Sequence, residues 1–325
     1  MSKILEITDL YVQYNTDDAV IYALNGVDLT LNKGETIGLV GETGAGKTTL
    51  ALSILNLLPV QVGQVAKGSI VFDGKNIMEL SKERTRKLRG KGIAMIFQDP
   101  MTSLNPTKTV GRQIREVLDV HFPKMPKREK QQRVNDIFQL VGIPHERQHE
   151  YPFQFSGGMR QRIGIAMALI GEPRLLLADE PTTALDVTIQ AQILELMRNL
   201  KEKFDTSMIL ITHDLGVVLE ICTKVSVIYS GQIIESGTVE DVYSKKYNHP
   251  YTEGLFNCIP NLTTDSDRLT PIPGQMPNPA DIPEGCKFYH RCTYRMDICQ
   301  AEEPEHFTKD THSIKCHLFK EKWGL

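Results

Sequence analysis

The sequence predicts an α/β fold built around a parallel sheet, and three apolar runs together with one helical segment support this prediction. Residues 36–40 read TIGLV, residues 174–180 read RLLLADE and residues 207–213 read SMILITH. Short apolar runs of this kind are typical of strands that are buried on both faces. Residues 188–204 have a helical pattern and separate the last two runs. Strands that alternate with helices indicate a parallel sheet.

The first part of the chain predicts a small antiparallel sheet. Residues 4–31 show strand-like alternation, which NTDD at residues 15–18 interrupts. A polar break between two alternating runs is typical of a turn. Residues 108–172 carry apolar side chains at spacings of three and four, so they predict a helical insertion into the α/β core.

Composition describes an ordinary globular protein. The 325 residues suffice for roughly two domains, and 37 Lys and Arg against 40 Asp and Glu give a net charge of -3. The basic stretch at residues 124–133 has no interleaved aromatic residue, so we interpret it as a solvated helix face. No nucleic-acid partner is expected.

The N-terminal sequence predicts a cytoplasmic protein. MSKILEITDL contains Glu6 and lacks the apolar run of a signal peptide. Residues 48–66 carry no charge, and their length alone would suggest a membrane span. Asn56, Pro59 and Gly63 argue against a span, so we interpret residues 50–58 as a buried helix that Pro59 ends.

A phosphate-binding loop follows the first apolar run. GETGAGKT at residues 41–48 fits the pattern G-x-x-x-x-G-K-[ST], with a strand before it and a helix after it. Glycines let the backbone N–H groups point at phosphates, the Lys reaches the β- and γ-oxygens, and the Thr can bind Mg²⁺. With Thr49, the expected nucleotide contacts are Gly41, Glu42, Thr43, Gly44, Ala45, Gly46, Lys47 and Thr48.

The other two apolar runs end on residues with catalytic chemistry. Asp179 at the end of LLLA can hold Mg²⁺, directly or through water, while Glu180 can orient or deprotonate the attacking water. His213 ends the next run in the same way, which favours a position facing the γ-phosphate. The sequence therefore predicts a phosphoryl-transfer site at the carboxyl ends of these strands.

A second anion-binding helix start lies at FSGGMRQR, residues 155–162. Ser156, Gly157 and Gly158 begin a long apolar helix, and helix starts favour anions. One nucleotide does not need two such anion-binding sites. We therefore expect this one to serve the nucleotide of another subunit, in a head-to-tail dimer.

In this order and spacing, the motifs resemble those of the ATP-binding subunits of ABC transporters over about residues 3–240. The resemblance implies that Gln98 in IFQDP binds Mg²⁺ or water, that Glu180 is the catalytic base and that His213 is the switch histidine. It also implies that FSGGM is the signature motif, with Met159 where Gln is commoner, and that Asp186 in ALD belongs to the D-loop.

The same resemblance implies an aromatic residue that stacks on adenine. Tyr14 lies 33 residues before Lys47 and matches the family position, while Tyr22 is a competing candidate. Stacking of an aromatic ring on a base is physically sensible. Either tyrosine could instead belong to the core.

The C-terminal part narrows the family. NHPYTEGLF at residues 248–256, a Pro-rich stretch and a Cys-rich end resemble the extension of dipeptide and oligopeptide importer ATPases, a group that includes nickel importers. We expect an ATPase domain over residues 1–245, with a helical subdomain at about 99–165, and an extension over residues 246–325.

Four of the six cysteines fall in the last 40 residues, with spacing C-x5-C-x6-C-x16-C. Four thiolates can bind Zn²⁺ or an iron–sulfur cluster, and reduced thiols without metal are the simpler alternative. The resemblance implies a [4Fe-4S] cluster on Cys286, Cys292, Cys299 and Cys316.

The resemblance implies an ATPase on the cytoplasmic face of the cell membrane that powers peptide import. Its implied partners are a second ATPase subunit that is a paralogue, two membrane permeases and, indirectly, an extracytoplasmic peptide-binding protein. Two alternatives stay open. One is a nickel importer ATPase, and the other is a soluble ABC ATPase in which a redox-sensing cluster controls hydrolysis.

Overall fold

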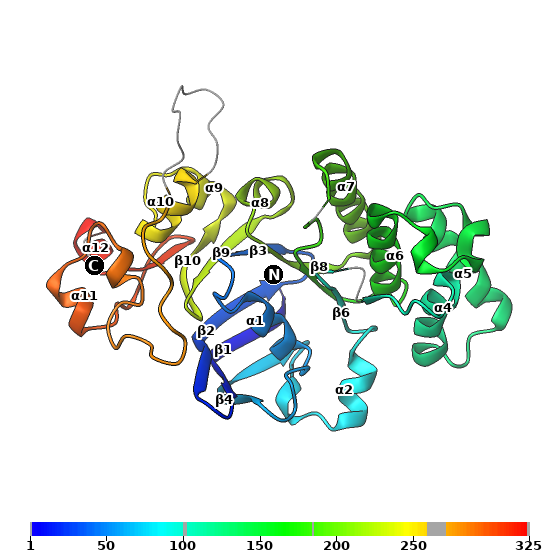
Figure 1. The fold of residues 1–325 in the computed structure, drawn as a ribbon, viewed down its shortest axis with the longest axis horizontal. Coiled ribbons are helices and arrows are strands. Elements are labelled where there is room, and N and C mark those ends of the chain that lie inside the picture. The colour runs from blue at the N-terminus through cyan, green and yellow to red at the C-terminus, as the bar shows by residue number, and fades with distance from the viewer. Residues whose placement is uncertain (1, 100–102, 184, 259–270, 324–325) are drawn as a thin grey trace. The chain divides into compact units, whose positions relative to one another are not determined.

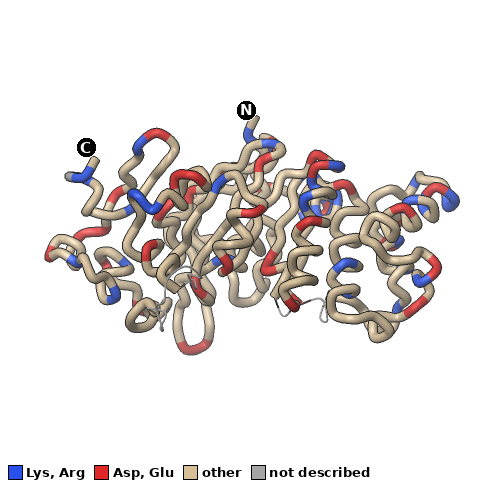
Figure 2. The backbone as a smooth tube through the Cα atoms, turned by 90° about the horizontal axis from the view of Figure 1, so that it is seen from above, with Lys and Arg blue, Asp and Glu red and all other residues tan. Residues whose placement is uncertain are grey.

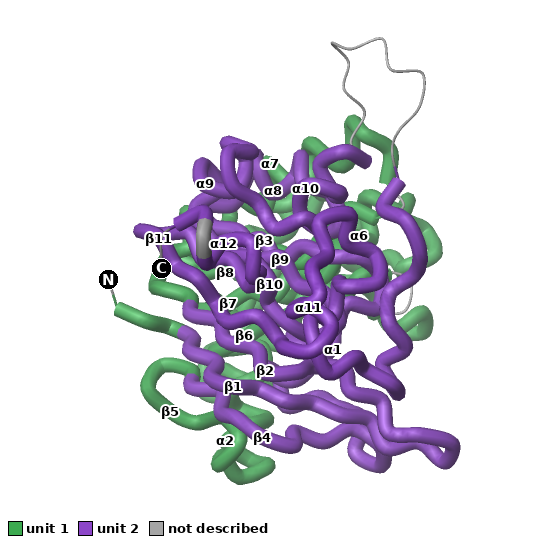
Figure 3. The backbone as a smooth tube through the Cα atoms, turned by 90° about the vertical axis from the view of Figure 1, so that its left-hand side faces the viewer, with its two compact units in different colours: residues 1–4, 31–36, 72–212 green, residues 5–30, 37–71, 213–325 purple. Residues whose placement is uncertain are grey.

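A computed structural model describes residues 2–99, 103–183, 185–258 and 271–323 of the chain (Figure 1). Position 100 of the predicted IFQDP motif and position 184 of the predicted ALD motif lie outside the described residues. The chain forms two compact units, which Figure 3 shows in different colours. The first unit comprises residues 1–4, 31–36 and 72–212, and the second comprises residues 5–30, 37–71 and 213–325.

The second unit contains the predicted N-terminal sheet. β1 (Lys3–Asn15) and β2 (Val20–Asn32) are neighbours joined by a short turn, where the Thr16 N–H donates to the carbonyl of Ala19 at 3.0 Å. β4 (Gly63–Phe72) lies on the other side of β1. The alternating burial along β1 explains the alternation in the sequence, because one face of the strand packs into the core.

A second sheet of the same unit includes the strand that leads to the phosphate loop. β3 (Thr36–Val40) is buried at every residue and pairs in parallel with β9 (Lys224–Tyr229). β10 (Gln232–Thr238) then pairs with β9 in antiparallel fashion. Residues 246–258 and 271–323 are called the C-terminal segment. The helices of this unit before it are α1 (Lys47–Ile54), α8 (Leu215–Ile221) and α9 (Val239–Tyr243).

The C-terminal segment continues this sheet, which the sequence did not predict. β12 (His312–Lys315) pairs with β10, with Glu235 opposite Ile314, and β11 (His306–Lys309) pairs with β12. The remaining elements are α10 (Pro250–Asn257), η4 (Tyr289–Arg291), α11 (Asp297–Ala301) and α12 (Leu318–Lys322).

A fully buried carboxylate joins the C-terminal segment to β10. Glu235 Oε1 contacts Asn248 Nδ2 and His312 Nε2, both at 2.8 Å, and Oε2 accepts the backbone N–H of His249 at 2.8 Å. Three partners compensate for the loss of water around the carboxylate. The segment is therefore held to the sheet by a polar network as well as by strand pairing.

The first unit contains the other two predicted parallel strands. β7 (Leu175–Asp179) lies between β6 (Ile93–Ile96) and β8 (Ser207–Thr212), and both pairings are parallel. α7 (Val187–Phe204) connects β7 to β8, as the sequence predicted. The unit also contains β5 (Lys75–Asn76), η1 (Ile77–Glu79) and α2 (Lys82–Leu88).

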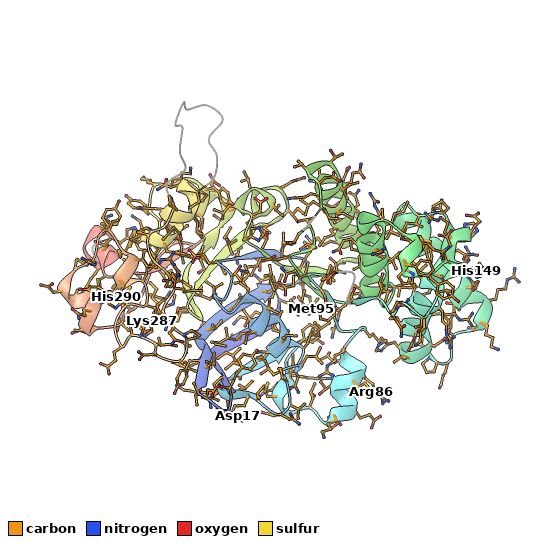
Figure 4. The ribbon with its side chains drawn as sticks, in the orientation of Figure 1. Asp17, Arg86, Met95, His149, Lys287 and His290 are labelled. Atoms are coloured by element: carbon orange, nitrogen blue, oxygen red, sulfur yellow. The ribbon has the colours of Figure 1, made fainter. Side chains whose placement is uncertain are left out.

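The insertion between β6 and β7 is helical, as predicted. α4 (Val110–His121), α5 (Lys127–Leu140) and α6 (Gly157–Leu169) pack against one another, with apolar residues such as Ile114 and Phe138 buried between them. Two short turns, η2 (His145–His149) and η3 (Pro152–Gln154), lead into α6. Figure 4 labels His149 in this insertion.

The helix after the phosphate loop is shorter than predicted. α1 ends at Ile54, Leu55 is its C-cap, and Asn56 adopts a left-handed φ of 51°. Asn tolerates this conformation and commonly ends helices. The prediction that Pro59 ends the helix was therefore wrong, because Asn56 stops it earlier.

Charges of both signs are interspersed along the chain (Figure 2). Within the basic stretch, Lys130 pairs with Asp119 at 2.8 Å and Arg133 pairs with Glu172 at 2.8 Å. Among the helices of the described residues, none combines the length and the apolar character that a membrane crossing requires.

Candidate active site

The phosphate-binding motif forms the turn between β3 and α1, within the second unit. Gly46 is the N-cap of α1 with a φ of 105°, and no side chain caps the helix. The first N–H groups of a helix have no partner within the helix, and they carry the positive end of its dipole. A helix start without a side-chain cap can therefore receive an anion.

Lys47 lies at the start of that helix with only 6% of its surface exposed. Its Nζ donates to the carbonyl of Gly41 at 2.6 Å and to the carbonyl of Glu42 at 3.0 Å. Carbonyl oxygens orient an ammonium group without neutralising its charge. The loop thus holds a positive charge beside the helix start.

Close backbone contacts explain the glycines of this loop. A Cβ on Gly41 would lie 2.3 Å from the carbonyl oxygen of Ile228, and a Cβ on Gly46 would lie 2.7 Å from that of Ala23. Gly44 has a φ of 86°. Larger residues would push the loop off β2 and β9, so the motif requires glycine for packing as well as for conformation.

The two tyrosines considered for adenine stacking differ in their surroundings. The Tyr14 hydroxyl lies 3.2 Å from Thr49 Oγ1 on α1, whereas the Tyr22 ring is 43% exposed on β2. Tyr14 is thus the one that contacts the helix after the phosphate loop. Thr49 is itself one of the predicted nucleotide contacts.

The predicted carboxylates lie at the end of β7 in the first unit. Asp179 is the last residue of the strand and is 3% exposed, and Glu180 follows it half-buried. Gln98 follows β6, and its Nε2 donates to Glu180 Oε2 at 2.9 Å. The parallel pairing of β6 and β7 brings these two predicted residues together, because both follow carboxyl ends of neighbouring strands.

The backbone at Glu180 adopts a conformation that is rare for this residue type. Its φ is 44°, and its N–H donates to the carbonyl of Ile211 at 2.9 Å. Such strained residues persist where the surroundings fix them, and they cluster at functional sites. The β8 strand therefore fixes the direction in which the Glu180 side chain leaves the sheet.

Thr183 is a site residue that the sequence analysis missed. Its hydroxyl donates to Glu180 Oε2 at 3.0 Å, the same oxygen that Gln98 contacts. Two hydrogen bonds to one oxygen orient the carboxylate. The only signal in the sequence is a hydroxyl residue three positions after Glu180.

His213 directly follows β8 and is exposed. The next residue, Asp214, caps α8 by accepting the N–H of Gly216 at 2.8 Å. The sequence prediction that His213 lies at the carboxyl end of a strand is therefore confirmed.

The predicted signature motif and Asp186 line one hollow of about 590 Å³ in the first unit. Ser156 is the N-cap of α6, and its Oγ accepts the N–H of Met159 at 3.4 Å. Asp186 is the N-cap of α7 and accepts the N–H of Ile189 at 3.0 Å. Two helices thus begin at this hollow; the start of α6 favours an anion there, whereas the start of α7 is already capped by the carboxylate of Asp186.

The two signature glycines differ in the space around them. A Cβ on Gly157 would meet no atom within 4 Å, whereas a Cβ on Gly158 would lie 2.8 Å from Ile189 Cγ2. Within this chain, packing thus requires glycine at position 158 but not at position 157.

Cys286, Cys292, Cys299 and Cys316 line one small cavity of about 10 Å³ in the second unit. Burial raises the pKa of Cys286 to about 11 and that of Cys316 to about 12, with a further contribution from the neighbouring thiols. No group of three or more His, Cys, Asp or Glu in the described ranges is arranged to hold a metal ion. The described residues therefore do not show the predicted metal site. The cavity between the four thiols has room for about one water molecule.

Comparison with known proteins reveals two family matches. Residues 24–183 match the model described as ABC transporter, and residues 234–299 match the model described as oligopeptide/dipeptide transporter, C-terminal region. The second match begins in β10 and ends at Cys299.

Relatives match over nearly the full chain. The oligopeptide transport ATP-binding protein OppD of Bacillus subtilis is 48% identical, over 98% of this chain and 89% of its own length. The dipeptide transport ATP-binding protein DppD of the same organism is 48% identical, over 98% of this chain and 95% of its own length. OppD of Haemophilus influenzae is 44% identical and covers both chains completely.

Solved structures have the same fold. A dimeric ATP-binding cassette in a post-hydrolysis state with ADP and Pi bound is 25% identical, with a TM-score of 0.65 over 72% of this chain and 98% of its own. The protein cbiO1 of Clostridium perfringens, part of an ABC transporter complex, is 29% identical, with a TM-score of 0.65 over 76% of this chain and 92% of its own.

The crowded position of Gly46 yields a test of the phosphate loop. We expect Gly46→Ala to lower the thermal midpoint and to abolish ATP binding, because the new Cβ would displace the helix start. Gly74→Ala is the matched control, since Gly74 has a φ of 74° but nothing within 4 Å of a Cβ. It should cost only the backbone strain of about 1–2 kcal/mol and leave ATP binding intact. Equal loss of binding in both variants would contradict this account of the loop.

Proposed function

Since this chain belongs to the ATP-binding subunits of ABC transporters, we propose that it hydrolyses ATP to energise the import of dipeptides or oligopeptides. The relatives named for oligopeptide and dipeptide transport support the substrate class, because they match almost the whole chain. The match of residues 234–299 to the C-terminal region of such transporters supports it as well. The observation that carries the proposal is this second match, since the ATPase motifs alone do not distinguish substrates.

We propose roles for the site residues in this reaction. Backbone N–H groups of residues 41–48 and the ammonium of Lys47 bind the phosphates of ATP, and Tyr14 stacks on the adenine. The hydroxyl of Thr48, the carboxylate of Asp179 and the amide oxygen of Gln98 are oxygen donors, which Mg²⁺ prefers. When bound, Mg²⁺ neutralises charge on the phosphates.

Glu180 is the proposed general base for the water that attacks the γ-phosphate. Its carboxylate is oriented by Gln98 and Thr183 and by the strained backbone at its own position. A base held in one direction needs little reorganisation when it accepts a proton. His213 is the proposed contact to the γ-phosphate.

We propose that the chain works as one half of a head-to-tail dimer of ATPase subunits. The hollow that Ser156, Gly157, Gly158 and Asp186 line contains the start of α6, which supports binding of a nucleotide held by the other subunit. The partner is proposed to be a paralogue. Two permeases and, indirectly, an extracytoplasmic peptide-binding protein complete the importer, and the chain lies at the cytoplasmic face of the membrane.

We further propose that residues 1–245 form the ATPase domain, with a helical subdomain at about 99–165, and that residues 246–325 form an extension with a [4Fe-4S] cluster. The cluster proposal rests on four thiols that line one cavity. Four Cys thiolates are the ligand set of such clusters. A cluster is larger than a single ion, so the cavity would have to widen to hold one.

The catalytic assignment predicts the behaviour of Glu180→Gln. We expect ATP to bind normally and turnover to fall about 10²–10⁴-fold, because the amide cannot accept the proton. Thr183→Val should reduce turnover by about tenfold at most, since it removes only one hydrogen bond to the carboxylate. ATP binding and phosphate release on the complete transporter are the measurements, and normal turnover in Glu180→Gln would exclude Glu180 as the base.

The substrate assignment is tested in the same assay. Vesicles that contain the permeases and both ATPase subunits should take up a labelled oligopeptide with the wild-type chain and not with Glu180→Gln. Uptake of labelled nickel without uptake of peptide would instead assign the nickel alternative.

The dimer proposal predicts different effects of two adjacent substitutions. Gly157→Ala should leave the thermal midpoint unchanged and prevent ATP-dependent association with the second ATPase subunit, because a methyl group would block the approach of the phosphate. Gly158→Ala should lower the thermal midpoint, because its Cβ meets Ile189. Sedimentation and thermal melting measure the two effects. Normal association of Gly157→Ala would contradict the head-to-tail arrangement.

The cluster proposal predicts about four iron and four sulfide per chain in protein purified without oxygen. Metal and sulfide analysis with an optical spectrum measures them. One zinc without iron would indicate a structural zinc site, and the absence of metal from anaerobic protein would contradict the cluster.

A further inference from the structure

The C-terminal segment contacts the phosphate loop directly, at a residue whose side chain the ATPase chemistry does not use. Glu42 is the second residue of the loop. The guanidinium of Arg291, at the end of η4, donates from NH1 to Glu42 Oε2 at 3.0 Å and from NH2 to Oε1 at 3.1 Å. Two parallel hydrogen bonds between a guanidinium and a carboxylate form a strong and directional ion pair.

The backbone of Glu42 is held as well. Its N–H donates to the hydroxyl of Tyr251 on α10 at 2.9 Å, and its carbonyl accepts from Lys47 Nζ at 3.0 Å. The C-terminal segment thus fixes the residue that in turn orients the phosphate-binding lysine. Packing between Tyr251 and Tyr229, with ring centroids 4.7 Å apart, keeps the hydroxyl in place.

Arg291 is itself rigidly placed. Its side chain is 6% exposed, and its Nε donates to the carbonyl of Pro273 at 2.8 Å. NH1 also donates to the hydroxyl of Tyr229 at 3.4 Å. Because Nε, NH1 and NH2 all donate hydrogen bonds, the guanidinium is fixed in one position. A lysine has one nitrogen and could not reproduce this geometry.

The charge of Glu42 gives this ion pair a consequence for ATP. A carboxylate in a loop that binds phosphates repels them, because both are negatively charged. Arg291 neutralises that carboxylate and holds its oxygens toward the C-terminal segment. Loss of Arg291 would leave an unpaired negative charge in the phosphate loop.

We propose that Arg291, supported by Tyr251, is a positioning residue of the phosphate loop, through which the C-terminal segment sets the affinity for ATP. The inference rests on the proposed binding of ATP by residues 41–48. It gives the extension a role in the ATPase site of its own chain, beyond any role in binding a cluster.

The test uses the full chain, Mg-ATP and a small set of variants. Equilibrium dialysis measures ATP affinity, and phosphate release by the complete transporter gives KM and kcat. We expect Arg291→Ala to weaken ATP binding by about tenfold or more, and Arg291→Lys to weaken it less. The kcat at saturating ATP should change by less than about twofold, because the ion pair acts on binding rather than on the reaction.

Removal of the Glu42 charge separates a positioning role of Arg291 from a purely structural one. Glu42→Gln removes the repelling charge, so the double variant Glu42→Gln/Arg291→Ala should bind ATP within about threefold of Glu42→Gln alone. If Arg291 only stabilised the fold of the segment, the double variant would show no recovery and would bind ATP as weakly as Arg291→Ala, because a neutral amide at position 42 would not restore that fold. Absence of recovery would therefore overturn the proposal.

Lys287 provides the matched control. It is 8% exposed, four residues before Arg291 in the same segment, and its Nζ lies 3.0 Å from Glu303 Oε2. Figure 4 labels Lys287 and His290 in this segment. Lys287→Ala removes a buried cation without a contact to Glu42, and we expect normal ATP affinity. Equal weakening in Lys287→Ala and Arg291→Ala would overturn the proposal. Failure of the wild-type chain to bind ATP would instead refute the proposed function.

Discussion

The phosphate loop has to present backbone N–H groups and one lysine to an anion while it packs tightly against neighbouring strands. Gly41 lies so close to the carbonyl of Ile228 that a Cβ there would be only 2.3 Å away. The parallel pairing of β3 with β9 creates this proximity. The conformation of the loop, the start of α1 and the position of Lys47 all depend on that backbone packing.

The C-terminal segment is part of the same structural unit as this loop. β12 extends the sheet beyond β10, Glu235 binds three groups from the segment, and Arg291 pairs with Glu42. Cys292, which follows Arg291 in the sequence, lines the small cavity between the four cysteines. Strand pairing, a buried polar network and the ion pair between buried Arg291 and half-buried Glu42 therefore connect the C-terminal segment to β10 and to the phosphate loop.

The carboxylate site follows a different constraint. Gln98 and Glu180 are 82 residues apart in the sequence and meet because β6 and β7 are parallel neighbours. The helical insertion lies between them in the chain, yet it leaves the strand ends in register. Glu180 then takes a left-handed backbone conformation that β8 stabilises through the carbonyl of Ile211.

Local patterns of apolar residues and glycines sufficed to predict the fold class, the phosphate loop, the three parallel strands and the helical insertion. The apolar run before Glu180 also pointed to that residue, whereas Gln98 came from the family resemblance, and neither predicted the hydrogen bond between the two. Contacts between residues that are distant in the chain arise only when the chain folds. The pairing of β12 with β10, the Thr183–Glu180 hydrogen bond and the Arg291–Glu42 ion pair depend on such contacts. The end of α1 at Ile54 depends on the left-handed backbone of a single residue, Asn56. Neither kind of feature leaves a periodic signal in the sequence.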